Sequence, residues 1–182
     1  GNLCFPDGNE LQGELSALYM ARVLGHSSVN ILHEDDAYGR TLADSFMSAA
    51  RDLGLEVRRN HRIDSRSENA SRKLKAVVED LQDGSRPDAL YLGLLDQEAA
   101  AFVKRLRDAG SDIPVFGGDA VGLGTFPREV ASRIGKSEDA GDYTDGIYTT
   151  TYFIRDVANK KAQKFHREYI EEYEHKPDAL AA

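Results

Sequence analysis

Short apolar runs alternate along this chain with longer segments in which apolar residues recur every three or four positions. Runs of the first kind are typical of buried β-strands, and segments of the second kind are typical of helices with one apolar face. A chain that alternates between the two folds most simply into parallel strands joined by crossover helices. We therefore predict an α/β fold, a three-layer αβα sandwich around a mostly parallel, doubly wound sheet.

The predicted elements can be placed by residue number. We expect strands at 29–33, 55–63, 89–95, 113–116 and 146–153. We expect helices at 11–23, 42–53, 74–81, 99–106, 126–134 and 162–173. The strand at 55–63 alternates and carries many charges, which favours a place at the edge of the sheet. The polar stretch 136–144 is expected to be a loop.

Composition limits the class of protein. Hydrophobic residues make up 41% of the chain, enough for a core, and the net charge of −8 argues against a nucleic-acid partner. The single cysteine, Cys4, cannot form an internal disulfide. No apolar run approaches the roughly 20 residues that span a bilayer, and no signal peptide is visible. We expect residues 1–182 to form a single α/β lobe, a fragment from which the partner lobe and the C-terminal crossing are absent.

Polar residues collect directly after three of the predicted strands. In a doubly wound sheet these loops meet at the carboxyl edge, beside the switch in strand order where ligands bind. A tyrosine there offers a ring for stacking and a hydroxyl group, a carboxylate suits an ammonium group, and a glycine lets the backbone approach a ligand closely. The predicted ligand-binding residues are Asp36, Tyr38, Asp96, Gln97, Gly118 and Asp119.

Acidic residues that follow a strand have a second interpretation, as helix caps. Asp35, Asp36 and Asp96 lie where predicted helices start, and a carboxylate there accepts hydrogen bonds from free backbone N–H groups. Both interpretations stay open for these three residues. Asp119 differs, because it follows two glycines and no helix is predicted to start there. We therefore interpret Asp119 as a ligand-binding residue.

Motifs for catalysis and for metal binding are weak. His33-Glu34-Asp35-Asp36 lacks the second histidine of a zinc-protease motif, and residues 117–122 lack the Lys-Ser/Thr of a phosphate-binding loop. A phospho-acceptor receiver domain with Asp96 as the acceptor is an alternative. It needs a lysine after the fifth strand, where the chain reads Thr149-Thr150-Thr151. We expect a binding protein and not an enzyme, with no metal and no cofactor.

Blocks of residues resemble, in order along the chain, the second lobe of type I periplasmic binding proteins. This group includes the branched-chain amino-acid-binding components of ABC transporters. No block is specific alone, and the ordered set carries the resemblance. The blocks are Pro6-Asp7 with Leu11-Gln12-Gly13, Val29 to Gly39, Pro87 to Gly93, Pro114 to Asp119, and Asp145 to Tyr148 followed by Phe165 to Tyr173 and Pro177-Asp178-Ala179.

The resemblance implies a solute-binding module, periplasmic or extracellular, that captures a small ligand for the membrane permease of an ABC transporter. It implies an amino acid as the ligand, with Tyr38 as an aromatic contact and Asp119 as the acid for the ammonium group. The loop Leu94-Leu95-Asp96-Gln97 lacks the aromatic residue that the family often has there. The ligand-binding domain of a membrane signalling receptor uses the same fold, so a sensor is a further alternative.

Overall fold

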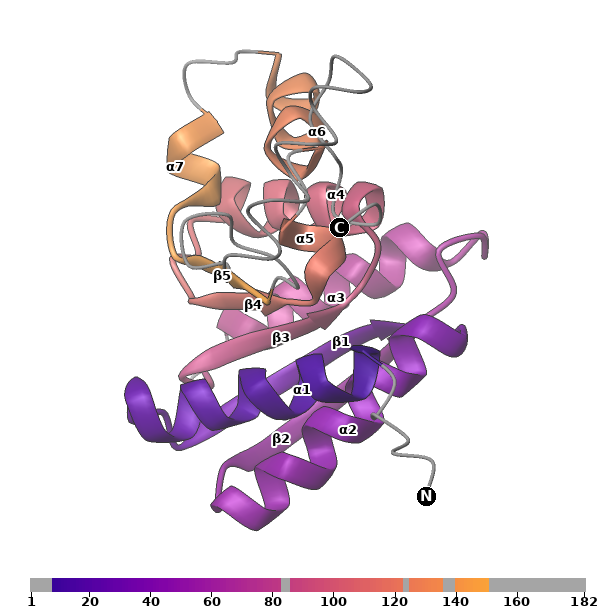
Figure 1. Cartoon of the computed structure of the whole chain (residues 1–182). Coiled ribbons are helices and arrows are strands. Elements are labelled where there is room, and N and C mark those ends of the chain that lie inside the picture. The colour runs from indigo at the N-terminus through magenta and orange to yellow at the C-terminus, as the bar shows by residue number, and fades with distance from the viewer. Residues whose placement is uncertain (1–7, 83–85, 123–124, 136–139, 151–182) are drawn as a thin grey trace, which may run out of the picture. The chain divides into compact units, whose positions relative to one another are not determined.

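A five-stranded parallel sheet in the order β2-β1-β3-β4-β5 forms the centre of the lobe (Figure 1). The structure is a computed structural model that describes residues 8–82, 86–122, 125–135 and 140–150. The strands are β1 (Ser28–Glu34), β2 (Glu56–Ile63), β3 (Ala89–Gly93), β4 (Val115–Gly117) and β5 (Ile147–Thr149). The helices are α1 (Gly8–Leu18), η1 (Tyr19–Val23), α2 (Ala37–Leu53), α3 (Ala70–Gln82), α4 (Asp96–Asp108), α5 (Asp119–Gly122), α6 (Thr125–Ile134) and α7 (Ala140–Thr144).

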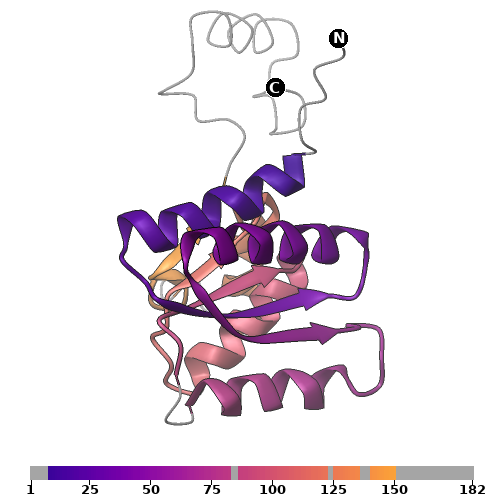
Figure 2. The same cartoon turned by 90° about the horizontal axis from the view of Figure 1, so that it is seen from below.

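Helices cover both faces of the sheet, as Figure 2 shows for α1 and α2 on one side and α3 on the other. Along β1, Val29 and Ile31 face α1 and α2, whereas Leu32 faces α3 and α4. This alternation is the period of two that a strand imposes on its side chains. Both faces of β1 are therefore buried, and the predicted three-layer α/β sandwich is confirmed, with β2 at an edge.

The ends of several elements differ from the prediction. Strand β3 stops at Gly93, because α4 begins at Asp96. The short helices α5 and α7 were not predicted, since about one turn is too short to show a helical period. The predictions that no helix starts at Asp119 and that 140–144 is a loop are therefore wrong.

Two predictions concern the C-terminal part of the chain. The chain divides into two compact units, 1–150 and 151–182, and all described residues belong to the first. The predicted helix at 162–173 lies outside the described residues. The single lobe expected for 1–182 also extends beyond them and stays a prediction.

Helix α2 places its large apolar side chains against the sheet. Leu42, Phe46 and Ala50 are fully buried. The ring of Phe46 stacks on that of Tyr91 in β3, with centroids 4.2 Å apart and planes at 14°. The helix ends at Gly54, whose φ of 75° lies in the left-handed region that a residue without a Cβ adopts at little cost. This helix has the ordinary amphipathic arrangement, with its apolar face inward.

Helix α1 lies beside α2 with the opposite arrangement, and the π-helix η1 continues α1 (Figure 1). At Gly13 the two helices come so close that an added Cβ would lie 2.7 Å from the backbone nitrogen of Phe46 and 2.8 Å from the carbonyl oxygen of Leu42. The buried face of α1 holds small or polar residues, namely Gln12, Gly13, Ser16 and Ala17. The large apolar residues that predicted the helix face solvent instead, namely Leu11, Leu15, Leu18, Tyr19 and Val23.

Candidate functional site

The carboxyl ends of the strands meet at one edge of the sheet, because all of the strand pairs are parallel. Loops that leave such an edge carry the ligand contacts of open α/β folds. Two groups of polar residues lie there. The first is a hydrogen-bonded cluster around Asp119, and the second is an acidic hollow beyond the ends of β1 and β2.

The Asp119 cluster joins residues from four parts of the chain. The hydroxyl of Tyr38, in the first turn of α2, donates to Asp119 Oδ1 at 3.1 Å. The side-chain oxygen of Gln12, on α1, accepts from the backbone N–H of Asp119 at 2.6 Å and from the hydroxyl of Thr150 at 3.1 Å. Gln12 is buried, with 3% of its surface exposed. The cluster therefore ties the starts of α1, α2 and α5 to the end of β5.

The electrostatics of the cluster keep Tyr38 in its neutral form. Burial raises the pKa of the Tyr38 phenol well above its ordinary value, and the negative charge of Asp119 raises the pKa further. Tyr38 therefore remains a hydrogen-bond donor to the carboxylate over the physiological pH range. The oxygen that Tyr38 contacts also accepts a hydrogen bond from the backbone N–H of Ala120 at 3.0 Å.

Gly118 makes this arrangement possible. A Cβ at this position would lie 2.8 Å from both the side-chain oxygen of Gln12 and the hydroxyl of Tyr38. No real Cβ tolerates such an approach, so the cluster needs a glycine. The carbonyl oxygen of Gly118 accepts a hydrogen bond from the hydroxyl of Thr149 at 2.8 Å, which holds the end of β4 against β5.

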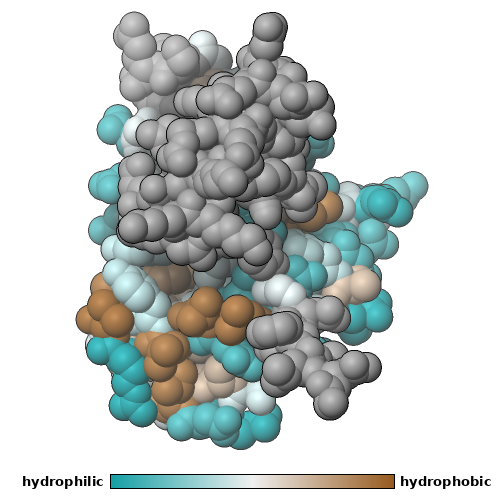
Figure 3. Space-filling model, viewed as in Figure 1, coloured by the Kyte–Doolittle hydropathy of each residue, from teal (hydrophilic) through white to brown (hydrophobic). Residues whose placement is uncertain are grey.

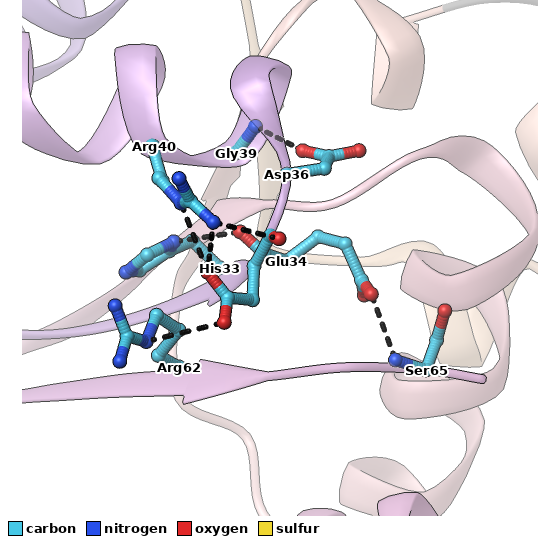
Figure 4. A network of polar contacts seen from close by, with 8 residues as sticks. His33, Glu34, Asp36, Gly39, Arg40, Arg62 and Ser65 are labelled. Atoms are coloured by element: carbon cyan, nitrogen blue, oxygen red, sulfur yellow. Dashed lines mark hydrogen bonds and ion pairs between the residues drawn. The ribbon is translucent and has the colours of Figure 1, made fainter. Parts of the chain in front are cut away.

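The acidic hollow has a volume of about 330 Å³. Glu34 enters it from the end of β1, and its Oε1 accepts a hydrogen bond from the backbone N–H of Ser65 at 2.7 Å (Figure 4). The second oxygen, Oε2, is buried and has no hydrogen-bond partner within the described part of the chain. The lining residues are Glu34, Asp35, Asp36, Asp64, Ser65, Arg66, Leu95 and Glu98.

Asp35 and Asp36 have partners within the lobe. Arg40 lies 2.6 Å from Asp35, and its hydrogen bond is the main reason that the pKa of this carboxyl group lies below the usual value. Asp36 caps α2, since its Oδ1 accepts from the backbone N–H of Gly39 at 2.7 Å (Figure 4). The capping interpretation is thus confirmed for Asp36, which nevertheless also lines the hollow.

The structure brings some of the predicted site residues together and separates others. Tyr38, Gly118 and Asp119 belong to one cluster. Asp96 and Gln97 instead occupy the first turn of α4, where Asp96 Oδ1 accepts from the backbone N–H of Gln97 at 2.9 Å. Among the described residues, neither belongs to the Asp119 cluster or to the lining of the hollow.

Several residues of the two groups were not predicted from the sequence. Gln12 was interpreted only as part of the predicted helix at 11–23, although a polar residue inside an apolar periodic segment was a usable signal. Glu98 and Asp64 were ordinary charges in the sequence, and only the fold places them around the hollow with Glu34. Within the described residues, no three His, Cys, Asp or Glu side chains are arranged to hold a metal ion. No described helix is both long enough and apolar enough to cross a membrane.

Comparison with known proteins matches this fold to one family. The family profile described as periplasmic binding protein matches residues 8–182. The chain is 27% identical over 118 residues to a Leu/Ile/Val-binding protein homologue of Brucella melitensis, covering 65% of this chain and 30% of that protein.

Solved structures agree. A putative branched-chain amino acid ABC transporter protein of Rhodospirillum rubrum superposes with a TM-score of 0.75 at 25% identity, covering 93% of this chain and 44% of that one. A leucine-binding protein of Thermotoga maritima superposes with a TM-score of 0.71 at 25% identity, covering 96% and 46%. The chain thus spans less than half the length of these solved relatives. The resemblance seen in the sequence is confirmed, and the chain belongs to the periplasmic binding protein family.

Proposed function

We propose that this chain is one lobe of an extracytoplasmic solute-binding protein that captures an amino acid for an ABC transporter. The observation that carries the proposal is the family match, which runs from residue 8 to residue 182. In this proposal the protein is not an enzyme, uses no cofactor and works in the periplasm or outside the cell. It delivers its ligand to a membrane permease.

The carboxyl edge offers the chemistry that an α-amino acid requires. An ammonium group is bound best by carboxylate oxygens that are shielded from water and still have acceptor capacity. Asp119 supplies one such carboxylate, held in place by Tyr38 and by the backbone of α5. Glu34 supplies the other, since its buried Oε2 has no partner within the described residues. A buried acceptor without a partner costs about 1–3 kcal/mol, and a ligand ammonium would remove that cost.

The hollow next to Glu34 suits a small ligand. Its volume of about 330 Å³ lies at the lower end of the range of small-molecule sites. The exposed side chain of Leu95 gives it one apolar wall. We propose that Asp36, Tyr38 and Gly118 shape this edge, and that Asp96 and Gln97 contribute from the start of α4 when the site closes on its ligand.

The proposal is tested by binding measurements on the intact protein with a panel of amino acids and of carboxylic acids that lack an amine. A specific ligand at about 100 times its dissociation constant should stabilise the protein by roughly 2.7 kcal/mol in a thermal-shift assay. We expect amino acids to stabilise the protein and the amine-free acids to leave its melting temperature unchanged. Binding only of amine-free acids would contradict the proposed ligand class.

Substitutions then locate the ammonium site. Asp119→Asn and Glu34→Gln each remove one negative charge with little change in shape, and the one that contacts the ammonium should weaken binding tenfold or more, about 1.4 kcal/mol. The matched control is Asp112→Asn, because Asp112 is exposed and its ion pair within the described residues is with Arg86, at a distance of 2.6 Å. If Glu34→Gln alone weakens binding, the prediction for Asp119 is wrong. If neither does, an ammonium site at this edge is ruled out.

A further inference from the structure

Basic residues gather around strand β2, at one edge of the sheet. Residues 51–75, from the last turn of α2 into the first half of α3, hold eight arginines and lysines and four acids, in a chain whose net charge is −8. Strand β2 is first in the strand order, so this segment lies at one side of the lobe (Figure 1). Figure 3 shows hydrophilic surface at the lower end of α2, whereas apolar surface gathers over α1. The chain thus carries a local basic region within an acidic whole.

A hollow of about 390 Å³ lies between α2 and β2 in this basic region. Its apolar residues are Met47, Leu55 and Val57. Its polar residues are Arg51, Arg58, Arg59 and Asn60. No carboxylate is among the described residues that line the hollow. The hollow therefore suits a group that carries negative charge together with some hydrocarbon.

The arginines around the hollow keep capacity for an incoming anion. The guanidinium of Arg51 forms no ion pair within the described part of the chain. Arg58 lies 3.3 Å from Glu56, in a pair whose two side chains are 36% and 66% exposed. Arg59 lies 2.8 Å from Asp80. Exposed ion pairs contribute little to stability, so a new carboxylate can share or replace the acid that Arg58 now contacts.

The outer side of β2 is open to a further strand. Among the described residues β2 pairs with β1 alone, and its eight residues make it the longest strand of the sheet. The outward backbone groups of such an edge strand are a template for an extended peptide. A bulge interrupts the pairing where consecutive residues of β1 lie opposite Val57 and Arg59, which leaves Arg58 opposite neither. The bulge lies where β2 borders the hollow.

We propose that the β2 edge and the neighbouring hollow bind an extended acidic segment of a partner protein. The segment adds to β2 as a further strand of the sheet. One of its carboxylates binds Arg51 and Arg58, and one of its apolar side chains packs against Met47 in the hollow. This surface shares no residue with the Asp119 cluster or with the acidic hollow, so the proposal goes beyond the ligand-binding function given above.

The charge of β2 selects an acidic partner over a second copy of this chain. The strand carries three arginines and one glutamate, so a second β2 would bring net like charge together. Charged side chains of this kind protect an edge strand from pairing with itself. An acidic strand instead gains charge-assisted hydrogen bonds to the same arginines. The edge is thus protected against self-association and open to a strand of opposite charge.

A peptide of alternating glutamate and threonine, matched to the eight residues of β2, tests the proposal. Fluorescence anisotropy should show that the labelled peptide binds the 182-residue chain, and hydrogen exchange of the β2 amides should slow in the complex. A lysine–threonine peptide of the same length should not bind. Absence of binding by the acidic peptide, or binding without protection of β2, would overturn the proposal. Binding of phosphatidylglycerol vesicles in place of the acidic peptide would overturn it as well, since lipid head groups supply charge without a strand.

Substitutions and a modified peptide separate the charge from the strand pairing. Arg51→Glu should weaken binding of the acidic peptide by about tenfold or more, because it replaces an attracting charge by a repelling one. Arg22→Glu is the matched control, since Arg22 is exposed in η1 and does not line the hollow, and it should bind as the native chain does. An acidic peptide with methylated backbone nitrogens keeps its charge and should not bind, because it cannot pair with β2. Equal losses in the two variants, no loss in Arg51→Glu, or full binding of the methylated peptide would each show that the proposal is wrong.

Discussion

Helices α1 and α2 lie side by side on the same face of the sheet, yet they bury opposite kinds of residue. Helix α2 turns Leu42 and Phe46 inward, whereas α1 turns Gln12, Gly13 and Ser16 inward and its leucines outward. Both helices have the same sequence period. The contrast teaches that apolar periodicity identifies a helix and one of its faces, and that the neighbours decide in which direction this face points.

The reason lies in the distance between the two helices. At Gly13 the backbone of α1 lies against the backbone of α2 around Leu42 and Phe46. Only small side chains fit into such a crossing, so the small face of α1 is the one that can be buried there. The side-chain oxygen of Gln12 on that face accepts hydrogen bonds within the Asp119 cluster at the carboxyl edge. Close packing and hydrogen bonding together outweigh the loss of leucine burial.

The largest difference between the helices should appear when an apolar residue is removed from each. Phe46→Ala in α2 should lower the free energy of unfolding by about 3–5 kcal/mol, because it leaves a cavity under the sheet. Leu15→Ala in α1 should change it by no more than about 0.5 kcal/mol, because Leu15 is 46% exposed. Denaturant titration of both variants measures the difference. Equal losses would show that α1 buries its leucines after all.

A smaller effect should follow from widening the crossing of the two helices. Gly13→Ala should destabilise the lobe by about 1–3 kcal/mol, because the new methyl group meets backbone atoms that cannot move aside. Gly141→Ala is the matched control, since nothing lies within 4 Å of a Cβ at that position of α7. The control should be neutral or slightly stabilising. A stabilising effect of Gly13→Ala would contradict the close approach of the helices.

Removing the buried side chain of Gln12 from α1 should lower the free energy of unfolding by a similar or smaller amount than Gly13→Ala. Gln12→Ala leaves the backbone N–H of Asp119 and the hydroxyl of Thr150 without their acceptor. The loss should lie at the lower end of about 1–3 kcal/mol, since Thr150 is only half-buried and can turn to water. Gln12→Glu keeps an acceptor oxygen and should recover part of this stability, as thermal denaturation of both variants would show. An unchanged melting temperature for Gln12→Ala would mean that the hydrogen bonds of Gln12 do not stabilise the lobe.

The smallest effect is expected at Tyr38, where α2 joins the same cluster. Tyr38→Phe should cost about 0.5–1.5 kcal/mol at neutral pH, through loss of the hydrogen bond to Asp119. The pKa of Tyr38 is raised in the folded chain, so its stabilising effect is present below pH 10, the ordinary tyrosine value, and is lost as the pH rises further. The advantage of the native chain over Tyr38→Phe should therefore shrink above about pH 10. A difference that stays constant to higher pH would contradict the burial of Tyr38.

Local signals account for the elements that were predicted correctly. The apolar run at Ala89 to Gly93 and the charged alternation at Glu56 to Ile63 were sufficient to predict a central strand and an edge strand. The glycines that follow η1 and α2, Gly25 and Gly54, have positive φ angles of 69° and 75°, the conformation that favours glycine at a helix end. The short helices α5 and α7 were not predicted, since each helix is shorter than the window in which a helical period can be recognised.

The candidate site was only partly predictable. Tyr38 and Asp119 were expected at one edge and are joined by a hydrogen bond across 81 positions of sequence. Gln12 was missed because its partner, Asp119, is 107 residues away. For Asp36 and Asp96 the sequence left helix start and ligand binding both open, and the structure places Asp36 as the cap of α2 and Asp96 in the first turn of α4.

The sequence by itself determined the α/β class, the parallel sheet, the position of most elements and the family, because these depend on local periodicity and on blocks of residues in order. The tertiary structure alone decided which face of α1 is buried, how Gln12 supports Asp119, and which acids surround the hollow beside Glu34. Each of these depends on atoms brought together from distant parts of the chain. The distances between these atoms are set by how the backbone packs, and the order of residues alone does not specify them.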